Sequence, residues 1–319
     1  MRPLSAPQPQ SAATHEHGTP TAGHSEHADH GAEKPKGSPK GGGRPSDLQI
    51  VYSISTDQGT TWSQPAPVHA DRTPNTVRGF FDAIVMANGE VAVAYLNDIP
   101  GKPHERDLKF VTSKGDKFGE VKTLDPFTCD CCNISLLVDH KGVLNLYYRE
   151  NQENTRDIYK MISTDNGATF SKADNLYADN WKINGCPHSG PTSSANASGN
   201  LIAWMSGTTE SPGIRVVTQQ GKRLFVLDDQ SAKNAFLVSA PKSSVLLWEQ
   251  NQSSETGLSS VIAYKNITSS DQNPGTQFVK NAISGTNATG VVVDNQLVVA
   301  YEIKHPNNKN SVGVAQVDL

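Results

Sequence analysis

One apolar strand pattern occurs five times along this 319-residue chain, and each copy ends near an aromatic residue. The copies place five aromatic residues in register, at intervals of 53, 56, 44 and 53 residues: Tyr95, Tyr148, Trp204, Trp248 and Tyr301. Between these runs the chain is rich in Gly, Asn, Asp and Pro, and after residue 47 no stretch keeps a helical period. A repeat of this length predicts a supersecondary unit that stacks against its neighbours.

The order of runs within each repeat predicts the fold. A shorter apolar run precedes each copy, near Phe81, Ile134, Pro191, Ala235 and Gly290, and a third run follows it. An inner, second, third and outer strand in succession form the antiparallel blade of a β-propeller. The third-strand pattern occurs six times and the first two patterns five times. We therefore predict an all-β propeller of five or six blades over residues 48–319, closed by an N-terminal hairpin that pairs with C-terminal strands.

Two turns share one motif, S-x-D-x-G-x-T-W/F, known as the Asp-box. In it the chain resembles the sialidase (neuraminidase) superfamily and other propellers with Asp-box (BNR) repeats. The resemblance implies a structural role on the outer rim, where the Asp accepts backbone amides and the Gly takes the left-handed turn. The motif residues are Ser55, Asp57, Gly59, Thr61 and Trp62 in the first turn, and Ser163, Asp165, Gly167, Thr169 and Phe170 in the second.

Residues 1–47 have almost no large apolar side chain, so they cannot offset the entropy of ordering, and we predict that they are disordered. This tail holds half of the ten histidines of the chain, interleaved with carboxylates: His15, His17, His24, His27 and His30. Imidazole and carboxylate groups at short spacing can capture a divalent metal or Cu(II). A solubilising linker is the alternative interpretation.

All four cysteines precede predicted inner strands. Cys129, Cys131 and Cys132 come before the second inner strand, and Cys186 with His188 comes before the third. In a propeller the loops that enter the inner strands converge at the mouth of the central channel. We therefore expect four thiols and an imidazole from neighbouring blades to approach one another.

Three kinds of site fit such a cluster. A disulfide between Cys186 and one of the others would leave two thiols unexplained. A redox-active thiol site would lack the usual C-x-x-C spacing. A soft-metal site uses all four sulfurs, with Met205 as a further thioether candidate. We favour copper over zinc, because a propeller does not need zinc to fold and the histidine-rich tail suits copper capture outside the cytoplasm.

The resemblance also implies a possible glycosidase, with an arginine triad, an aspartate acid/base and a tyrosine nucleophile assisted by a glutamate. Arg78 stands where the first arginine would be, but the family's Arg-Ile-Pro reads Arg78-Gly79-Phe80 here. Tyr301 and Glu302 are adjacent and would point to opposite faces of a strand. Two alternatives to metal handling therefore stay open, a sialidase-like hydrolase and a carbohydrate- or protein-binding propeller with a structural disulfide.

The charge pattern excludes some classes of partner. The net charge is −4 without a basic stripe, so we expect no nucleic-acid partner, and no apolar run approaches the roughly 20 residues of a membrane span. The first ten residues lack the apolar core of a secretory signal. We expect a periplasmic or secreted protein whose signal is not present in this sequence, with a metal ion and a metal-donor or acceptor protein as partners.

Overall fold

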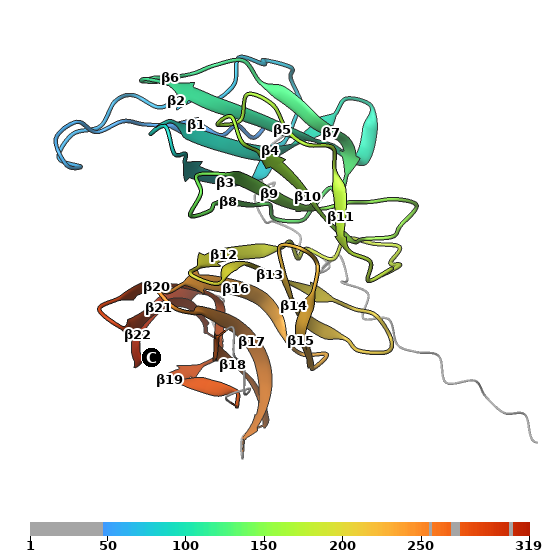
Figure 1. Ribbon diagram of the computed structural model, residues 1–319, viewed down its shortest axis with the longest axis vertical. Helices are drawn as coiled ribbons and strands as arrows, with labels where there is room; N and C mark the ends of the chain where they lie inside the picture. Colours follow the sequence, from blue (N-terminus) through green and yellow to red (C-terminus); the bar gives the residue numbers. More distant parts are fainter. Residues whose placement is uncertain (1–46, 255–256, 269–274, 306–308) are drawn as a thin grey trace, which may run out of the picture. The chain divides into compact units, whose positions relative to one another are not determined.

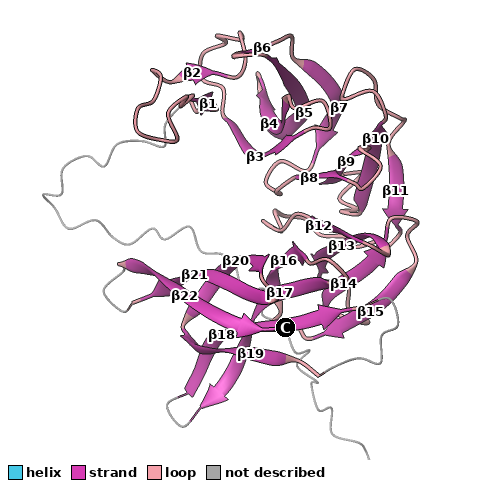
Figure 2. Cartoon of the chain, turned by 60° about the vertical axis from the view of Figure 1, so that its left-hand side comes forward, coloured by secondary structure: helices cyan, strands magenta, loops and turns pink. Residues whose placement is uncertain are grey.

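The computed structural model describes residues 47–254, 257–268, 275–305 and 309–319, and the predicted tail lies outside them apart from Asp47. Throughout these ranges the regular structure is strand, as Figure 2 shows. No helix in this part of the chain could cross a membrane.

Five antiparallel sheets follow one another along the chain, so each occupies a run of neighbouring colours in Figure 1. The first contains β3 (Arg78–Val85), β4 (Val91–Ile99), β5 (Lys102–Lys114), β6 (Lys117–Phe118) and β7 (Lys122–Thr128). The second contains β8 (Ser135–Val138), β9 (Leu144–Arg149), β10 (Ile158–Ser163) and β11 (Asp174–Tyr177). The third contains β12 (Thr192–Asn196), β13 (Gly199–Ser206), β14 (Gly213–Thr218) and β15 (Arg223–Asp228). The fourth contains β16 (Lys233–Ser239), β17 (Ser244–Ser254), β18 (Gly257–Ile267) and β19 (Gln277–Ile283), and the fifth β20 (Gly285–Val293), β21 (Gln296–Lys304) and β22 (Asn310–Asp318).

This is the predicted all-β propeller, with each sheet as a blade. The first strand of every sheet contacts the first strand of the next, from β3 through β8, β12 and β16 to β20. The predicted repeat aromatics all lie on second strands and are all buried. Apolar side chains of neighbouring sheets mix in shared clusters, so the core lies between successive blades.

The N-terminal hairpin differs from its prediction. β1 (Val51–Tyr52) pairs with β2 (Ala66–Pro67), and β22 pairs with β21, so the expected pairing between the hairpin and the C-terminal strands was wrong for the described residues. Ile50 and Val68 beside the hairpin are instead buried against Val93 and Tyr95 of β4. Burial of these apolar side chains holds the hairpin on the first blade.

Both Asp-box turns have the predicted hydrogen bonds. In the second turn, Asp165 accepts hydrogen bonds from the backbone amide and hydroxyl of Thr169 and from the hydroxyl of Ser163. The bond from the Thr169 side chain contributes most to lowering the pKa of Asp165 to about 2. Asp57 has the same arrangement, with its pKa also lowered to about 2, chiefly by the Thr61 hydroxyl. These carboxylates therefore serve the turns themselves.

The aromatic residues of the two turns have different surroundings. Phe170 packs edge to face on Phe110 of β5, with ring centroids 4.8 Å apart, whereas Trp62 is 62% exposed. Only the second turn joins two blades through its aromatic side chain. Its glycine is correspondingly crowded, because a Cβ at Gly167 would lie 2.6 Å from a ring carbon of Phe110, while one at Gly59 would meet nothing closer than 3.8 Å.

We predict that Gly167→Ala destabilises the protein more than Gly59→Ala. Both glycines have a left-handed backbone, with φ of +79° and +90°, so both substitutions incur about 1–2 kcal/mol of backbone strain. Only at Gly167 does the added methyl overpack the interface between blades, at a further cost of about 1–3 kcal/mol. Urea unfolding followed by tryptophan fluorescence measures both, and equal losses of stability would contradict the packing described here.

Candidate metal centre

The two cysteine-bearing loops lie directly before neighbouring inner strands. Residues 129–134 join β7 to β8, and residues 178–191 join β11 to β12. The backbone amide of Cys129 donates to the carbonyl of Arg149 at the end of β9, 3.2 Å away. Since β8 contacts β12, the loops that precede these strands are brought to the same place, as the repeat alignment predicted.

A glycine allows the two loops to approach at backbone distance. A Cβ placed on Gly190 would lie 1.9 Å from the carbonyl oxygen of Asn133 and 2.6 Å from its carbonyl carbon. Real Cβ atoms essentially never come closer than 3.0 Å to such atoms. Any larger residue at Gly190 would therefore push the loop of Cys186 away from the loop of Cys132.

The side chain of Arg149 holds the loop before β12 in place through hydrogen bonds. Its guanidinium donates to three backbone carbonyls, those of Ser189, Arg156 and Met205, and it lies over the ring of Trp181. The side chain is almost fully buried, so these bonds lie in a medium where water does not compete. One charged group thereby ties the loop before β12 to the ends of β9 and β13.

The five predicted ligands fall into two overlapping sets. The sulfurs of Cys129, Cys131 and Cys132 lie within 4.8 Å of one another, and so do the ligand atoms of Cys131, Cys186 and His188. Two ligands at the ~2.3 Å of a metal–sulfur bond can be at most about 4.6 Å apart, so each set is close to the size of a coordination shell. The first three cysteines are buried, Cys186 is half-buried and His188 is exposed.

All four cysteines are free thiols in this structure. The sulfurs of Cys129 and Cys132 are 3.1 Å apart, well beyond the ~2.05 Å of a disulfide. The thiol of Cys186 donates to Asp130, 3.1 Å away. Asp130 was missed in the sequence, although it stands within the cysteine cluster itself.

The cluster holds its protons unevenly. Hydrogen bonds from the thiols of Cys131 and Cys132 lower the pKa of Cys129. The hydrogen bond between Cys131 and Cys129 in turn raises the pKa of Cys131. Burial raises the pKa of Cys132 to about 12 and that of Cys186 to about 11. Thus one thiolate is favoured, and several thiolates together need additional positive charge.

Charged groups behind the cluster also act on it. The guanidinium of Arg156 favours the thiolate of Cys129, and that of Arg149 favours the thiolate of Cys132. Glu150 is buried nearby, where desolvation, reinforced by Asp125, raises its pKa to about 8. Neither Arg149, the last residue of β9, nor Glu150 was predicted as part of this site, because β9 reads as an ordinary core strand.

Two other predicted groups are not brought to the cluster by any described contact. Met205 lies in β13 and meets Arg149 through its backbone carbonyl. The tail histidines His15, His17, His24, His27 and His30 lie outside the described residues.

The exposed histidine opens onto a cleft. His188 lines a cavity of about 290 Å³ together with residues from the first strands of four successive blades, β3, β8, β12 and β16. Phe81 and Asp82 of β3 lie in this lining, and desolvation raises the pKa of Asp82. The outer ligand set therefore lies beside a cavity lined by the inner strands.

Arg78, which the resemblance places at a sialidase-like site, pairs with a carboxylate of the protein. Arg78 pairs with Asp71 at 2.5 Å, and its side chain is fully buried. Arg106 pairs with Asp98 at 2.7 Å, close to Phe80. Tyr301 is buried beside the core of the last two blades, while Glu302 accepts hydrogen bonds from Asn287 and Asn310. Arg78, Tyr301 and Glu302 thus each contact other residues of the protein.

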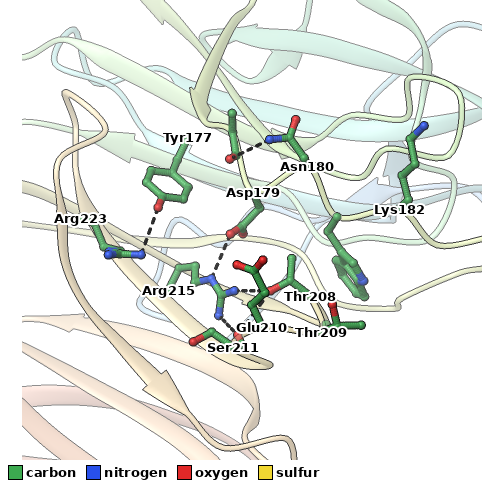
Figure 3. Close-up of a pocket in the computed structure, with 13 residues that line it drawn as sticks. Tyr177, Asp179, Asn180, Lys182, Thr208, Thr209, Glu210, Ser211, Arg215 and Arg223 are labelled. Carbon is green, nitrogen blue, oxygen red and sulfur yellow. Dashed lines mark hydrogen bonds and ion pairs between the residues drawn. The ribbon is translucent and has the colours of Figure 1, made fainter.

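A larger cleft of about 800 Å³ lies between the second and third blades (Figure 3). In it Arg215 pairs with Asp179 at 3.0 Å and also donates to Ser211 and Thr208, while Arg223 reaches the hydroxyl of Tyr177. The buried guanidinium of Arg215 is therefore already neutralised by Asp179. The lining is polar and suits a hydrated ligand, but it holds none of the cysteines.

Several solved structures resemble this chain in their backbone at low sequence identity. A Hadza microbial sialidase shares 13% identity with a TM-score of 0.48, covering 85% of this chain, which spans 59% of that protein's length. A polysaccharide lyase of family PL25, an ulvan lyase, shares 11% identity with a TM-score of 0.47, covering 85% of this chain and 79% of its own. A glycosyl hydrolase from Bacteroides ovatus shares 14% identity with a TM-score of 0.40, and the match covers 76% of this chain and 84% of that protein. No curated protein sequence matches the chain.

The family is shown by sequence. The model of the BNR repeat-like domain matches residues 38–207, just over half of the chain. This range includes both Asp-box turns and both cysteine-bearing loops. The chain belongs to the family of BNR repeat-like domains.

Proposed function

We propose that this propeller binds a soft metal ion, copper as Cu(I), through Cys129, Cys131, Cys132, Cys186 and His188. The observation that carries the proposal is the meeting of two loops, which sets the ligand atoms of Cys186 and His188 within 4.8 Å of Cys131. These residues lie 55 to 57 positions apart in the sequence, so only the fold unites them. Thiolates clustered at this spacing are the ligands that soft metals select.

The ligand set favours Cu(I) over zinc. Each group of mutually close atoms has three members, and Cu(I) accepts a trigonal set of soft ligands. Structural zinc is almost always four-coordinate and tetrahedral. The surroundings also favour a monovalent ion, because two buried guanidinium groups already supply positive charge near Cys129 and Cys132. Zinc is the alternative, and a titration with each metal distinguishes it from copper.

Handling of the ion, as opposed to hydrolysis of a glycoside, fits the other contacts. Arg78, the candidate for substrate binding in a glycosidase, is buried and paired with Asp71. The histidines of the tail would act as a collecting arm, raising the local metal concentration as a tethered site does. We further propose a location outside the cytoplasm and exchange of the ion with a donor or acceptor protein.

We expect the reduced full-length chain to bind Cu(I) in competition with a Cu(I) chelator, and to prefer it to Zn²⁺. Cys131→Ser should weaken Cu(I) binding at least about tenfold, because the Cys131 sulfur belongs to both ligand sets. The measurement is an anaerobic titration with elemental analysis of the purified complex.

His140→Ala serves as the matched control, since His140 is an exposed histidine outside both sets. Its Cu(I) affinity should equal that of the unchanged protein. Thermal unfolding of each metal-free variant tests whether the fold is retained. Equal Cu(I) affinity in folded Cys131→Ser and in the unchanged protein would refute the proposed site. Tighter binding of Zn²⁺ than of Cu(I) by the unchanged protein would refute the choice of copper.

A backbone substitution tests whether the meeting of the loops matters. Gly190→Ala changes no ligand residue but forces the two loops apart at Asn133, so it should lower Cu(I) affinity about ten- to a hundredfold. Gly185→Ala, in the same loop, has room for the methyl, with its nearest neighbour at 4.0 Å, and should bind as the unchanged protein does. The same chelator competition measures both variants. Equal affinities would mean that the loop contact does not set the site.

A further inference from the structure

The ligand atoms of the proposed site do not form one group. They form a buried set of three thiols and an outer set with Cys186 and His188, and Cys131 is the only member of both. An ion bound at ~2.3 Å from its ligands needs those atoms to be mutually within about 4.6 Å, which each set satisfies by itself to within a few tenths of an ångström. A single ion that used all five ligands would require the loops to move.

We propose that the centre holds two Cu(I) ions bridged by the sulfur of Cys131. This inference rests on the proposed function and adds its stoichiometry and the division of its ligands. The inner ion binds Cys129, Cys131 and Cys132, and the outer ion binds Cys131, Cys186 and His188. A thiolate sulfur has enough lone pairs to bind two metal ions at once, so Cys131 can serve both positions.

Positive charge near the centre supports several thiolates together. The guanidinium groups of Arg149 and Arg156 are buried beside Cys132 and Cys129, while the carboxylate of Asp130 accepts a hydrogen bond from the thiol of Cys186. Two Cu(I) ions bring one more positive charge to these sulfurs than a single ion would.

The two positions differ in access to solvent. The inner ligands are at most 5% exposed, whereas Cys186 is half-buried and His188 is exposed beside the cleft of about 290 Å³. Ions therefore enter and leave through the outer position, and the inner position exchanges through it. His188 is the ligand that an incoming donor would meet first.

The test is an anaerobic Cu(I) titration of the reduced full-length chain against a Cu(I) chelator, followed by elemental analysis and X-ray absorption at the copper edge. All four cysteines of the chain belong to the centre, so copper bound by cysteine sulfur reports this site and not the histidine tail. We expect two sulfur-bound Cu(I) ions per chain and a copper–copper scattering path. Saturation at one sulfur-bound ion without that path would overturn the inference while leaving the proposed function intact.

Variants separate the two positions. Cys186→Ser and His188→Ala should each retain one Cu(I) ion, the inner one, while Cys132→Ser should retain only the outer one, which the chelator removes faster. Cys131→Ser should lose the copper–copper path, and His140→Ala should keep two ions. Two chelator-resistant ions in folded His188→Ala would overturn the division of ligands, and the absence of sulfur-bound Cu(I) in the unchanged protein would refute the proposed function itself.

Discussion

The close contact between the loop before β8 and the loop before β12 is the constraint on which the site depends. Gly190 lies against the backbone of Asn133, where no side chain fits, and Arg149 binds the carbonyl of the neighbouring Ser189. Neither residue offers a metal ligand. The adjacent inner strands bring the two loops together. Gly190 and Arg149 then set the distance between sulfur atoms that are far apart in the sequence.

The propeller separates what stabilises the blades from what forms the site. Apolar clusters between successive sheets and the Asp-box turn at Phe170 hold the blades together, and none of these contacts needs the cysteines. The loops before the inner strands are consequently free to carry chemistry unrelated to that of other family members. Here they carry thiols, and Arg78, the arginine that the resemblance places at a substrate carboxylate, pairs with Asp71.

Much of this arrangement could be predicted from the sequence because the repeat is regular. The five buried aromatics fixed the second strands, and hence the loops in which Cys129 and Cys186 had to lie. The sequence left the number of blades at five or six, and the predicted closure was wrong, since the short N-terminal hairpin packs on β4 through apolar residues that carry no pairing signal.

Other parts of the site depend on tertiary contacts that leave no local pattern. Arg149 reads as a strand end, and Gly190 as one loop glycine among many, until Ser189 and Asn133 are seen beside them. The exposure of Trp62 was likewise hidden, because its motif is the same as that of the packed Phe170. The division of the ligands into two sets follows from interatomic distances alone.

The central claim is that the meeting of these loops creates a soft-metal centre. A crystal structure of the copper-loaded protein, with anomalous diffraction at the copper edge, tests it most directly. The account predicts anomalous density within ~2.3 Å of the Cys131 sulfur, between the two loops. Copper found only elsewhere on the chain, or a disulfide joining Cys186 to one of the other cysteines with no metal beside it, would contradict it.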